Sequence, residues 1–304
     1  MAHVPVLPRN RADLLETAER RWAAVSAARP DLDPAVQLQR RLISLVIDLS
    51  VAIDGGRLPR LSLPAKYIAA KLARGVPALA GEPVPLPVAA LTPSVLRLCD
   101  ALAEGGAGES ARHIREAIAS GAMEPVSLFT ASLARDQSAI RTGASHRGLA
   151  PDLVWLVAEL AVGPFVHALQ QSLFGGQGAA ALSDWNKGYC PTCGSWPALA
   201  EVVGGHRILR CSFCSMAWEL KTYACIYCEE SGESFVTAAP DDERKDRRVE
   251  VCSACGSYLK TVDLPELSPF PLLAIADLET MDLDVAAMEH HYQRPALKDF
   301  AVRR

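Results

Sequence analysis

Apolar side chains recur at helical spacing through the first part of the chain. Residues 11–28 place them at close to a 3.6-residue period, at Leu14, Leu15, Ala18, Trp22 and Val25. Asp33, followed by proline, is a typical helix start, and this second helix should run to Ile53. Further helices are expected at residues 63–73, 109–120, 124–141 and 149–174, with another opening at Thr92 and Pro93. The pattern predicts an N-terminal helical domain, residues 1–182.

Two stretches rich in Gly and Pro interrupt the helical pattern. The run from Gly75 to Ala90 (GVPALAGEPVPLPVAA) cannot continue a helix, so we expect an extended loop there. The run from Gly175 to Ala181 (GGQGAAA) predicts a flexible joint at the end of the helical domain.

Beyond this joint the pattern changes to that of short strands. Two hairpins are expected, at residues 198–203 with 207–210 and at residues 234–239 with 248–251, the second bridged by a charged loop over 240–247. Further strands are expected at 216–220 and 258–264, and residues 277–293 predict an acidic helix. We therefore expect an α+β chain in which an all-α bundle precedes two ribbons, residues 183–222 and 223–268, each a small antiparallel sheet, and a tail, residues 269–304.

Eight of the nine cysteines fall into four C-x-x-C pairs within the predicted ribbons. A tetrahedral metal site takes two ligands from each of two tight turns, with the sulfurs about 2.3 Å from the metal. The first two pairs read C-x2-C-x17-C-x2-C, a zinc-ribbon spacing, and the last two read C-x2-C-x23-C-x2-C. We expect two metal ions, one held by Cys190, Cys193, Cys211 and Cys214 and the other by Cys225, Cys228, Cys252 and Cys255. All-sulfur coordination suits either iron or zinc, and spacing does not separate them.

Paired cysteines also occur in disulfide frameworks and in thiol redox proteins. The first ten residues (MAHVPVLPRN) contain no apolar leader segment. We therefore expect the chain to stay in the reducing cytoplasm, where clustered thiols favour metal over disulfides.

Charge and hydropathy argue against two classes of partner. Residues 187–260 hold nine Lys or Arg against ten Asp or Glu, and each four-thiolate site with a divalent ion adds about two negative charges. Such a region lacks the basic face that nucleic-acid-binding ribbons present to phosphates. The longest apolar stretches, 42–53 and 153–166, fall short of the roughly 18 to 20 residues that span a bilayer, so no membrane insertion is expected.

The remaining chemistry-bearing residues indicate no catalytic site. Cys99 lies on an apolar helical pattern with Leu98 and Leu102, which is typical of a buried core thiol. The sequence contains no phosphate-binding loop, dinucleotide fingerprint or zinc-protease motif. Because four cysteines would fill every position of each metal, no open position is left for catalysis, and we do not expect an enzyme.

The cysteine-rich region resembles a known family. The residues that carry the likeness are Cys190-Pro-Thr-Cys-Gly-Ser-Trp-Pro197, Cys211-Ser-Phe-Cys214 with Trp218, the third pair, and Cys252-Ser-Ala-Cys-Gly-Ser-Tyr-Leu-Lys-Thr-Val262. With the tail segment Asp277-Leu-Glu-Thr-Met-Asp-Leu-Asp284, this pattern is similar to that of the formate dehydrogenase accessory protein FdhE family. The chain departs from the family where only Lys221 could supply a basic residue before the third pair, and where Lys298-Asp299-Phe300 replaces Asn-Pro-Phe.

The resemblance implies an assembly factor. Members of this family act in the cytoplasm on the catalytic subunit of formate dehydrogenase, and their rubredoxin-like ribbons hold metal. It therefore implies a chaperone that binds this subunit as its client, with the metal sites serving structure and a redox-sensitive client interaction. Candidate client contacts are Trp196, Trp218 and Lys221, of which the two tryptophans are also expected to cover the first metal.

Three other interpretations of the paired cysteines stay open at this stage. The metals could serve only to fold segments too small to have a core of their own. The ribbons could bind nucleic acid, which the acidic balance disfavours, or carry electrons as rubredoxins do, for which the long helical half has no evident use.

Overall fold

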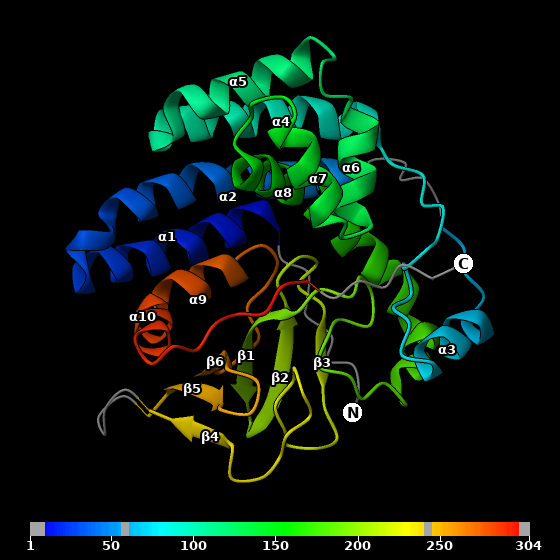
Figure 1. Ribbon diagram of the computed structural model, residues 1–304, viewed down its shortest axis with the longest axis vertical. Helices are drawn as coiled ribbons and strands as arrows, with labels where there is room; N and C mark the ends of the chain where they lie inside the picture. The colour runs from blue at the N-terminus through cyan, green and yellow to red at the C-terminus, as the bar shows by residue number, and fades with distance from the viewer. Residues whose placement is uncertain (1–9, 56–60, 240–244, 298–304) are drawn as a thin grey trace. The chain divides into compact units, whose positions relative to one another are not determined.

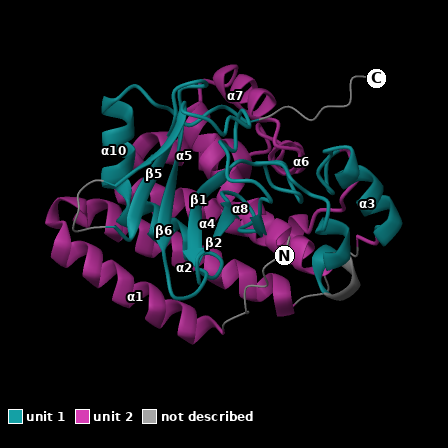
Figure 2. Ribbon diagram, turned by 90° about the horizontal axis from the view of Figure 1, so that it is seen from below, with its two compact units in different colours: residues 1–8, 63–80, 173–304 teal, residues 9–62, 81–172 magenta. Residues whose placement is uncertain are grey.

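The computed structural model describes residues 10–55, 61–239 and 245–297, which form two compact units. One unit takes in Leu63–Ala80 and Leu173–Arg304, and the other takes in Arg9–Ser62 and Gly81–Ser172 (Figure 2). The N-terminal residues 1–9, residues 240–244 of the expected charged loop, and the tail segment 298–300 that departs from the family pattern lie outside the described residues. We call the two units the sheet unit and the helical unit.

The helical unit is built from amphipathic helices, as the periodic pattern predicts. Its elements are α1 (Arg11–Ala28), η1 (Pro30–Leu32), α2 (Asp33–Gly55), α4 (Val88–Leu102), η2 (Ala103–Ala107), α5 (Gly108–Ala119), α6 (Pro125–Leu133), α7 (Gln137–Ser145) and α8 (Pro151–Phe174), which ends in the sheet unit (Figure 1). Helix α1 packs on α2, α2 on α4, and α4 on α5. Trp22, completely buried, donates from its indole to Gln39 Oε1 at 2.9 Å, which joins α1 to α2.

Two helix boundaries differ from those expected in this unit. Helix α4 begins at Val88, four residues before the expected start, and Pro93 lies inside it. The single helix expected over residues 124–141 is wrong, because the chain breaks between α6 and α7. Arg135 has a φ of 61° at this break, and its buried guanidinium forms an ion pair with Glu159. The Asp136 carboxylate accepts a hydrogen bond from the Ala139 N–H at 2.8 Å and thereby caps the N-terminus of α7.

Helix α8 is both long and apolar. By length and composition it could cross a membrane, and 61% of its most apolar 18-residue window is buried inside the structure. The core helix of a globular protein meets the same criterion.

The sheet unit contains one six-stranded sheet. Its strands are β1 (Pro197–Val203), β2 (His206–Cys211), β3 (Ala217–Glu219), β4 (Phe235–Ala238), β5 (Arg247–Cys252) and β6 (Ser257–Asp263), in the order β3-β2-β1-β6-β5-β4 (Figure 1). Both expected hairpins form, and Gly204 and Gly205 supply the two positive φ values of the first turn.

The α+β class is as predicted, but the two ribbons do not form separate sheets. Strand β1 of the first pairs in parallel with β6 of the second, with Ala200 opposite Thr261 and Val202 opposite Asp263. The expected split into ribbons at residues 183–222 and 223–268 therefore describes two halves of one sheet. Their union satisfies the backbone groups of two strands that would otherwise be sheet edges.

Two short helices, α9 (Leu273–Glu279) and α10 (Met281–Glu289), pack on this sheet. Leu273 and Ala276 of α9 contact Leu199 of β1, and Ala287 of α10 packs with Val249, Val251 and Tyr258. The continuous acidic helix expected over residues 277–293 is therefore wrong, since the chain turns at Thr280.

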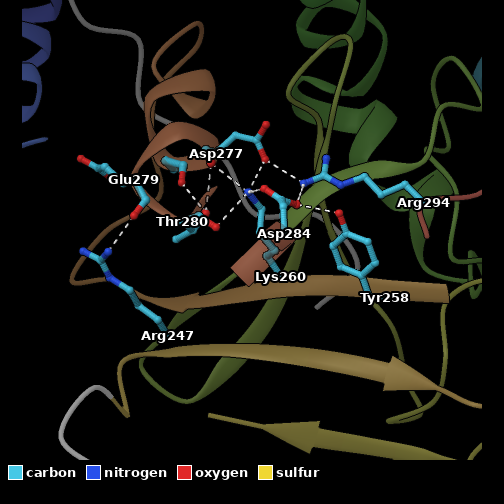
Figure 3. A network of polar contacts seen from close by, with 9 residues as sticks. Arg247, Tyr258, Lys260, Asp277, Glu279, Thr280, Asp284 and Arg294 are labelled. Carbon is cyan, nitrogen blue, oxygen red and sulfur yellow. Dashed lines mark hydrogen bonds and ion pairs between the residues drawn. The ribbon is translucent and has the colours of Figure 1, made fainter. Parts of the chain in front are cut away.

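The ammonium group of Lys260 explains this turn (Figure 3). Its Nζ atom lies at the C-terminal end of α9, where it donates to the Asp277 carbonyl at 2.8 Å and to the Thr280 carbonyl at 3.4 Å. Arg247 donates a hydrogen bond to the carbonyl of Glu279, the last residue of α9, at 2.7 Å. Cations at a helix C-terminus satisfy its free carbonyls and stabilise the dipole, so the two basic side chains end α9 there.

The segment of the sheet unit that comes from early in the sequence contains α3 (Ala65–Ala73) and part of the expected loop. Helix α3 packs against η3 (Gly176–Leu182), a 3-10 helix that occupies most of the expected flexible joint. Prediction placed all of residues 63–80 in the helical domain, whereas the structure places them in the sheet unit.

Candidate metal centres

Each C-x-x-C pair forms the same tight turn. The residue that follows the second cysteine donates its backbone N–H to the carbonyl of the first cysteine, over 2.8–3.2 Å. These four residues, Gly194, Ser215, Glu229 and Gly256, all have φ between 54° and 83°. The left-handed conformation reverses the chain directly after each pair, and glycine adopts it without strain at two of the four positions.

The turns bring the eight sulfur atoms into two groups within the described residues. Site 1 is Cys190, Cys193, Cys211 and Cys214, and site 2 is Cys225, Cys228, Cys252 and Cys255. Within each site all four sulfurs lie within 4.8 Å of one another. The consecutive pairs come together, while the ninth cysteine, Cys99, is completely buried in α4 of the helical unit.

The sulfur spacing fits a tetrahedral ion. A tetrahedron whose sulfurs lie about 2.3 Å from the metal has edges of about 3.8 Å, whereas a disulfide bond is about 2.05 Å long. Sγ–Sγ distances are 3.5, 3.7 and 3.9 Å in site 1 and 3.6 and 3.7 Å in site 2. Both groups could therefore hold a metal ion, and four sulfurs are compatible with either zinc or iron.

Backbone donors support thiolate ligands in site 1. The N–H of Thr192 points at Cys190 Sγ at 3.4 Å, and those of Phe213 and Cys214 point at Cys211 Sγ at 3.4 Å. Ser195 Oγ lies 3.3 Å from Cys193 Sγ, where its hydroxyl can donate to a thiolate. Such donors stabilise the deprotonated sulfur that a metal requires.

Residues 75–80, which we call the cover segment, lie against the first turn of site 1. The N–H groups of Ala78 and Leu79 donate to the carbonyls of Pro191 and Thr192, the two residues inside the first C-x-x-C pair, at 2.8 and 2.9 Å. Tyr189 donates its hydroxyl to the Gly75 carbonyl at 2.8 Å. The cover segment therefore pairs with the first turn along its backbone, and all four cysteines of site 1 are buried.

A buried lysine holds the cover segment in place. Lys71 of α3 is only 3% exposed, and its ammonium donates to the carbonyls of Ala78 and Ala80 at 3.0 and 2.6 Å. These two hydrogen bonds connect α3 to the cover segment that follows it in the chain. Because a buried ammonium group is tolerated only when it is hydrogen-bonded, the lysine is well placed to fix this conformation.

A second buried cation lies directly beside site 1. Arg210, which precedes Cys211 in β2, is completely buried and pairs with the equally buried Glu201 of β1. Its guanidinium also donates to the carbonyls of Ser268 and Ser215 at 2.7 and 3.3 Å, the second of which follows Cys214. The arginine thus stabilises the second turn of site 1 through its hydrogen bond to the Ser215 carbonyl.

The two sites differ in how deeply their cysteines are buried, and burial affects the pKa of the thiols. Desolvation raises the pKa of Cys190 and Cys214 well above the ordinary value, because neither sulfur is reached by water. Without an ion, site 1 therefore favours neutral thiols, and a bound cation supplies the charge that makes thiolates stable there.

Site 2 is more open to solvent than site 1. Cys228 is exposed and Cys255 is half-buried, while Cys225 and Cys252 are buried. Burial raises the pKa of Cys225; burial also acts on Cys255, but hydrogen bonds with Ser257 and Cys228 outweigh it and lower the pKa of that thiol.

Contacts between aromatic rings connect the first turn of site 1 to the first turn of site 2. Trp196, which follows site 1's first turn, stands edge-on to Tyr189 and to Tyr227, with ring centroids 5.8 and 5.0 Å away. Tyr227 lies between the cysteines of site 2's first turn. At Gly188 the backbone passes so close that an added Cβ would lie 1.9 Å from the Ile226 carbonyl oxygen, so the two turns are in direct contact.

The predicted client contacts differ in exposure. Trp218 is 1% exposed and donates its indole N–H to the Lys187 carbonyl at 3.1 Å, so it serves the interior of the sheet unit. Trp196 is half-buried and donates to the Ala296 carbonyl at 2.8 Å. Lys221 is exposed, with Nζ 4.0 Å from Asp184 Oδ1. Of the three, Lys221 is the side chain most available to a partner, and its role stays a prediction.

Sequence reasoning missed the cover segment and Lys71. The sequence does contain a signal, since Lys71 follows Ile68 by three residues and precedes Leu72, and these apolar neighbours define the buried side of α3. A lysine at the margin of such a face is usually solvated, so the pattern alone does not distinguish Lys71 from an exposed residue.

Comparison with known proteins finds that part of the cysteine-rich region is similar to one family. Residues 209–300 match the sequence model described as "FdhE, C-terminal domain". Proteins named "Protein FdhE" from Escherichia coli O127:H6 (strain E2348/69 / EPEC) and from Shigella boydii serotype 18 (strain CDC 3083-94 / BS512) are each 34% identical to the chain over 116 residues. These alignments span 37% of the chain and 37% of each relative.

A solved structure shares the fold over a longer stretch. The crystal structure of the FdhE protein from Pseudomonas aeruginosa superimposes with a TM-score of 0.61 and covers 97% of both chains at 22% sequence identity. The helical unit, for which the sequence likeness is only general, therefore has the same fold in that protein.

Proposed function

We propose that the chain, whose residues 209–300 match the FdhE C-terminal domain model, is an assembly factor for the catalytic subunit of formate dehydrogenase. It binds this subunit as a client and catalyses no reaction itself. Two metal ions, each in a four-cysteine site, form part of the folded client-binding surface. The protein works in the cytoplasm, where reduced thiols remain free to hold metal.

The observation that carries the proposal is the pair of four-cysteine groups in the region that matches the family. All of site 2 and two cysteines of site 1 lie within residues 209–300. Four sulfurs complete each tetrahedron and leave no coordination position for a substrate, which supports a binding role over catalysis. The acidic balance of residues 187–260 supports a protein client over a nucleic acid.

The client surface is proposed to lie on the sheet unit. Metal sites of this kind stabilise the turns that carry them, so loss of an ion should alter the surface around them. Lys221 and Trp196 lie beside these turns and are the candidate contacts, with Trp218 supporting them from the interior.

A capture experiment tests the proposal. The tagged wild-type chain, purified without oxygen, should retain the purified catalytic subunit of formate dehydrogenase. The double variant Cys190→Ser/Cys193→Ser removes half of the site 1 ligands and should weaken capture by about tenfold or more, because the first turn loses its metal. Cys99→Ala, which removes the cysteine outside both sites, should capture normally.

Circular dichroism of the helical unit controls for global unfolding in each variant. Normal capture by the Cys190→Ser/Cys193→Ser protein would show that the client does not depend on site 1. Binding of the wild type to DNA at physiological salt, with no capture of the subunit, would instead favour a nucleic-acid role.

A further inference from the structure

The two four-cysteine sites differ in how they are enclosed, although their ligands are the same. Site 1 has four buried cysteines, whereas site 2 has an exposed Cys228 and a half-buried Cys255. A metal ion leaves a thiolate site through stepwise attack on its ligands by a competing ligand or by water. The accessibility of the first sulfur to be attacked therefore governs how fast each site exchanges its ion.

We propose that the two sites have separate duties: site 1 holds its ion permanently, and site 2 exchanges its ion with thiol-bearing carriers in solution. This inference rests on the metal binding in the proposed function. The exchange replaces one divalent ion by another and leaves all four sulfurs deprotonated. It therefore needs no oxidant or reductant.

The first turn of site 1 is covered by another segment of the chain, whereas site 2 presents exposed residues in both of its turns. In site 1 the two residues between Cys190 and Cys193 have their carbonyls bonded by Ala78 and Leu79 of the cover segment. In site 2 the two residues inside the second turn, Ser253 and Ala254, are exposed, and so is Cys228 at the end of the first turn. Cys228 therefore offers a competing thiol an exposed residue of site 2 to attack, whereas all four cysteines of site 1 are buried.

The cover segment is what makes site 1 permanent. It reaches the first turn from more than one hundred residues earlier in the chain, and the Lys71 ammonium holds it there through the carbonyls of Ala78 and Ala80. Loss of this ammonium would leave two carbonyls of the cover segment without their donor. The segment would open more often, and site 1 would then be exposed to the same attack as site 2.

The inference is tested by timing the release of the two ions. The wild-type chain, loaded with two zinc ions, is mixed with an excess of the chromogenic chelator 4-(2-pyridylazo)resorcinol, and zinc transfer is followed by absorbance. We expect two phases of equal amplitude. The variant Cys252→Ser/Cys255→Ser, which retains only site 1, should lack the fast phase.

Two lysine variants on one helix test the cover segment. Lys71→Met should accelerate the slow phase by about tenfold, since it removes two buried hydrogen bonds, and should leave the fast phase unchanged. Lys66→Met is the matched control, because Lys66 is an exposed residue of α3, and both phases should match the wild type.

A measurement on the wild type keeps the test decisive if Lys71→Met fails to fold. Brief exposure to chelator and iodoacetamide, followed by mass spectrometry, should alkylate the four cysteines of site 2 before those of site 1. Equal release rates for both ions, or alkylation of site 1 first, would overturn the inference. A chain that binds no metal at all would instead contradict the proposed function, so the two failures are distinguishable.

Discussion

At the scale of single residues, Lys260 is a buried charge of the sheet unit that contacts two carboxylates. Its side chain is completely buried, and its ammonium lies 2.7 Å from Asp277 and 2.6 Å from Asp284. Arg294 reaches the same two carboxylates at 2.9 Å, so two cations and two anions alternate in one network (Figure 3). Removal of Lys260 leaves the two carboxylates with the single cation of Arg294, so the charges of the network no longer balance.

We therefore predict that Lys260→Met destabilises the sheet unit by about 3 kcal/mol. The methionine fills a similar volume, so the loss reflects the ammonium and its bonds to the end of α9. Denaturant unfolding followed by tryptophan fluorescence measures it. Lys221→Met is the control, because that lysine is exposed and 4.0 Å from its carboxylate, and its effect should stay within about 0.5 kcal/mol.

The same network predicts the direction of the pH dependence. Burial acts to raise the pKa of Asp277, but the Arg294 and Lys260 cations outweigh it and hold the pKa below the ordinary value of 3.8. A carboxyl with a lowered pKa stabilises the fold above pH 3.8, and this contribution is lost as the pH falls through the folded-state pKa. The difference in free energy of unfolding between wild type and Lys260→Met should therefore become smaller below pH 3.8. A difference that does not change with pH would show that Asp277 gains no stabilisation from Lys260.

At the scale of elements, one ion pair connects the two hairpins. Arg207 of β2 donates to both carboxylate oxygens of Glu250 in β5, at 2.7 and 2.5 Å, and Glu250 also accepts from Thr261 of β6 at 3.1 Å. Glu250 is 3% exposed. The pair therefore spans both halves of the sheet from a buried position.

A double-mutant cycle tests this connection. Arg207→Met leaves the Glu250 carboxylate buried without its cation and should destabilise the sheet unit by about 3 to 5 kcal/mol. Adding Glu250→Gln removes the stranded charge while keeping an acceptor for Thr261, so the double variant should be more stable than Arg207→Met alone. Additive losses in denaturant unfolding would show that the two side chains do not act as a pair.

The elements also show where periodicity is a sufficient predictor. Helix α1 and the four strands of the two hairpins lie within a few residues of their expected positions. The sequence patterns that predict them involve only residues that are neighbours along the chain. The breaks at Arg135 and Thr280 were missed, since each depends on a buried basic side chain. Arg135 pairs with Glu159 in another helix, and Lys260 reaches Thr280 from β6.

At the scale of the whole molecule, the candidate metal sites within the described residues belong to one unit. Both four-cysteine sites lie in the sheet unit, and the described part of the helical unit contains Cys99 alone. The helical unit has its own apolar core, including Trp22, Ile47 and Phe129. Its folding should therefore not require metal.

We predict that metal removal unfolds the sheet unit and spares the helical unit. Elemental analysis of the protein purified without oxygen should give two ions per chain, and prolonged chelation under reducing conditions should remove both. Near-ultraviolet circular dichroism from Trp185, Trp196 and Trp218 should then collapse, while most of the far-ultraviolet helical signal remains. Parallel loss of both signals would mean that the helices depend on the metal-bound sheet.

The sequence by itself determined the local parts of this protein. Helical periodicity, turn residues and C-x-x-C pairs are patterns over a few positions, and each depends on the geometry of a single turn or helix. The α+β class, the helical region and the eight cysteines of the two sites follow from such patterns. The likeness to a family was readable for the same reason, because its motif residues cluster around those turns.

Only the tertiary structure decided how these parts are joined and enclosed. The parallel pairing of β1 with β6, the placement of residues 75–80 over site 1, and the exposure of Cys228 all depend on segments far apart in the chain. Hydrogen bonds between backbone groups carry no residue-type signal, so the pairing of Ala78 with Pro191 leaves no trace in the sequence. Two sites with the same ligands thus differ because one is covered by a distant segment and the other is not.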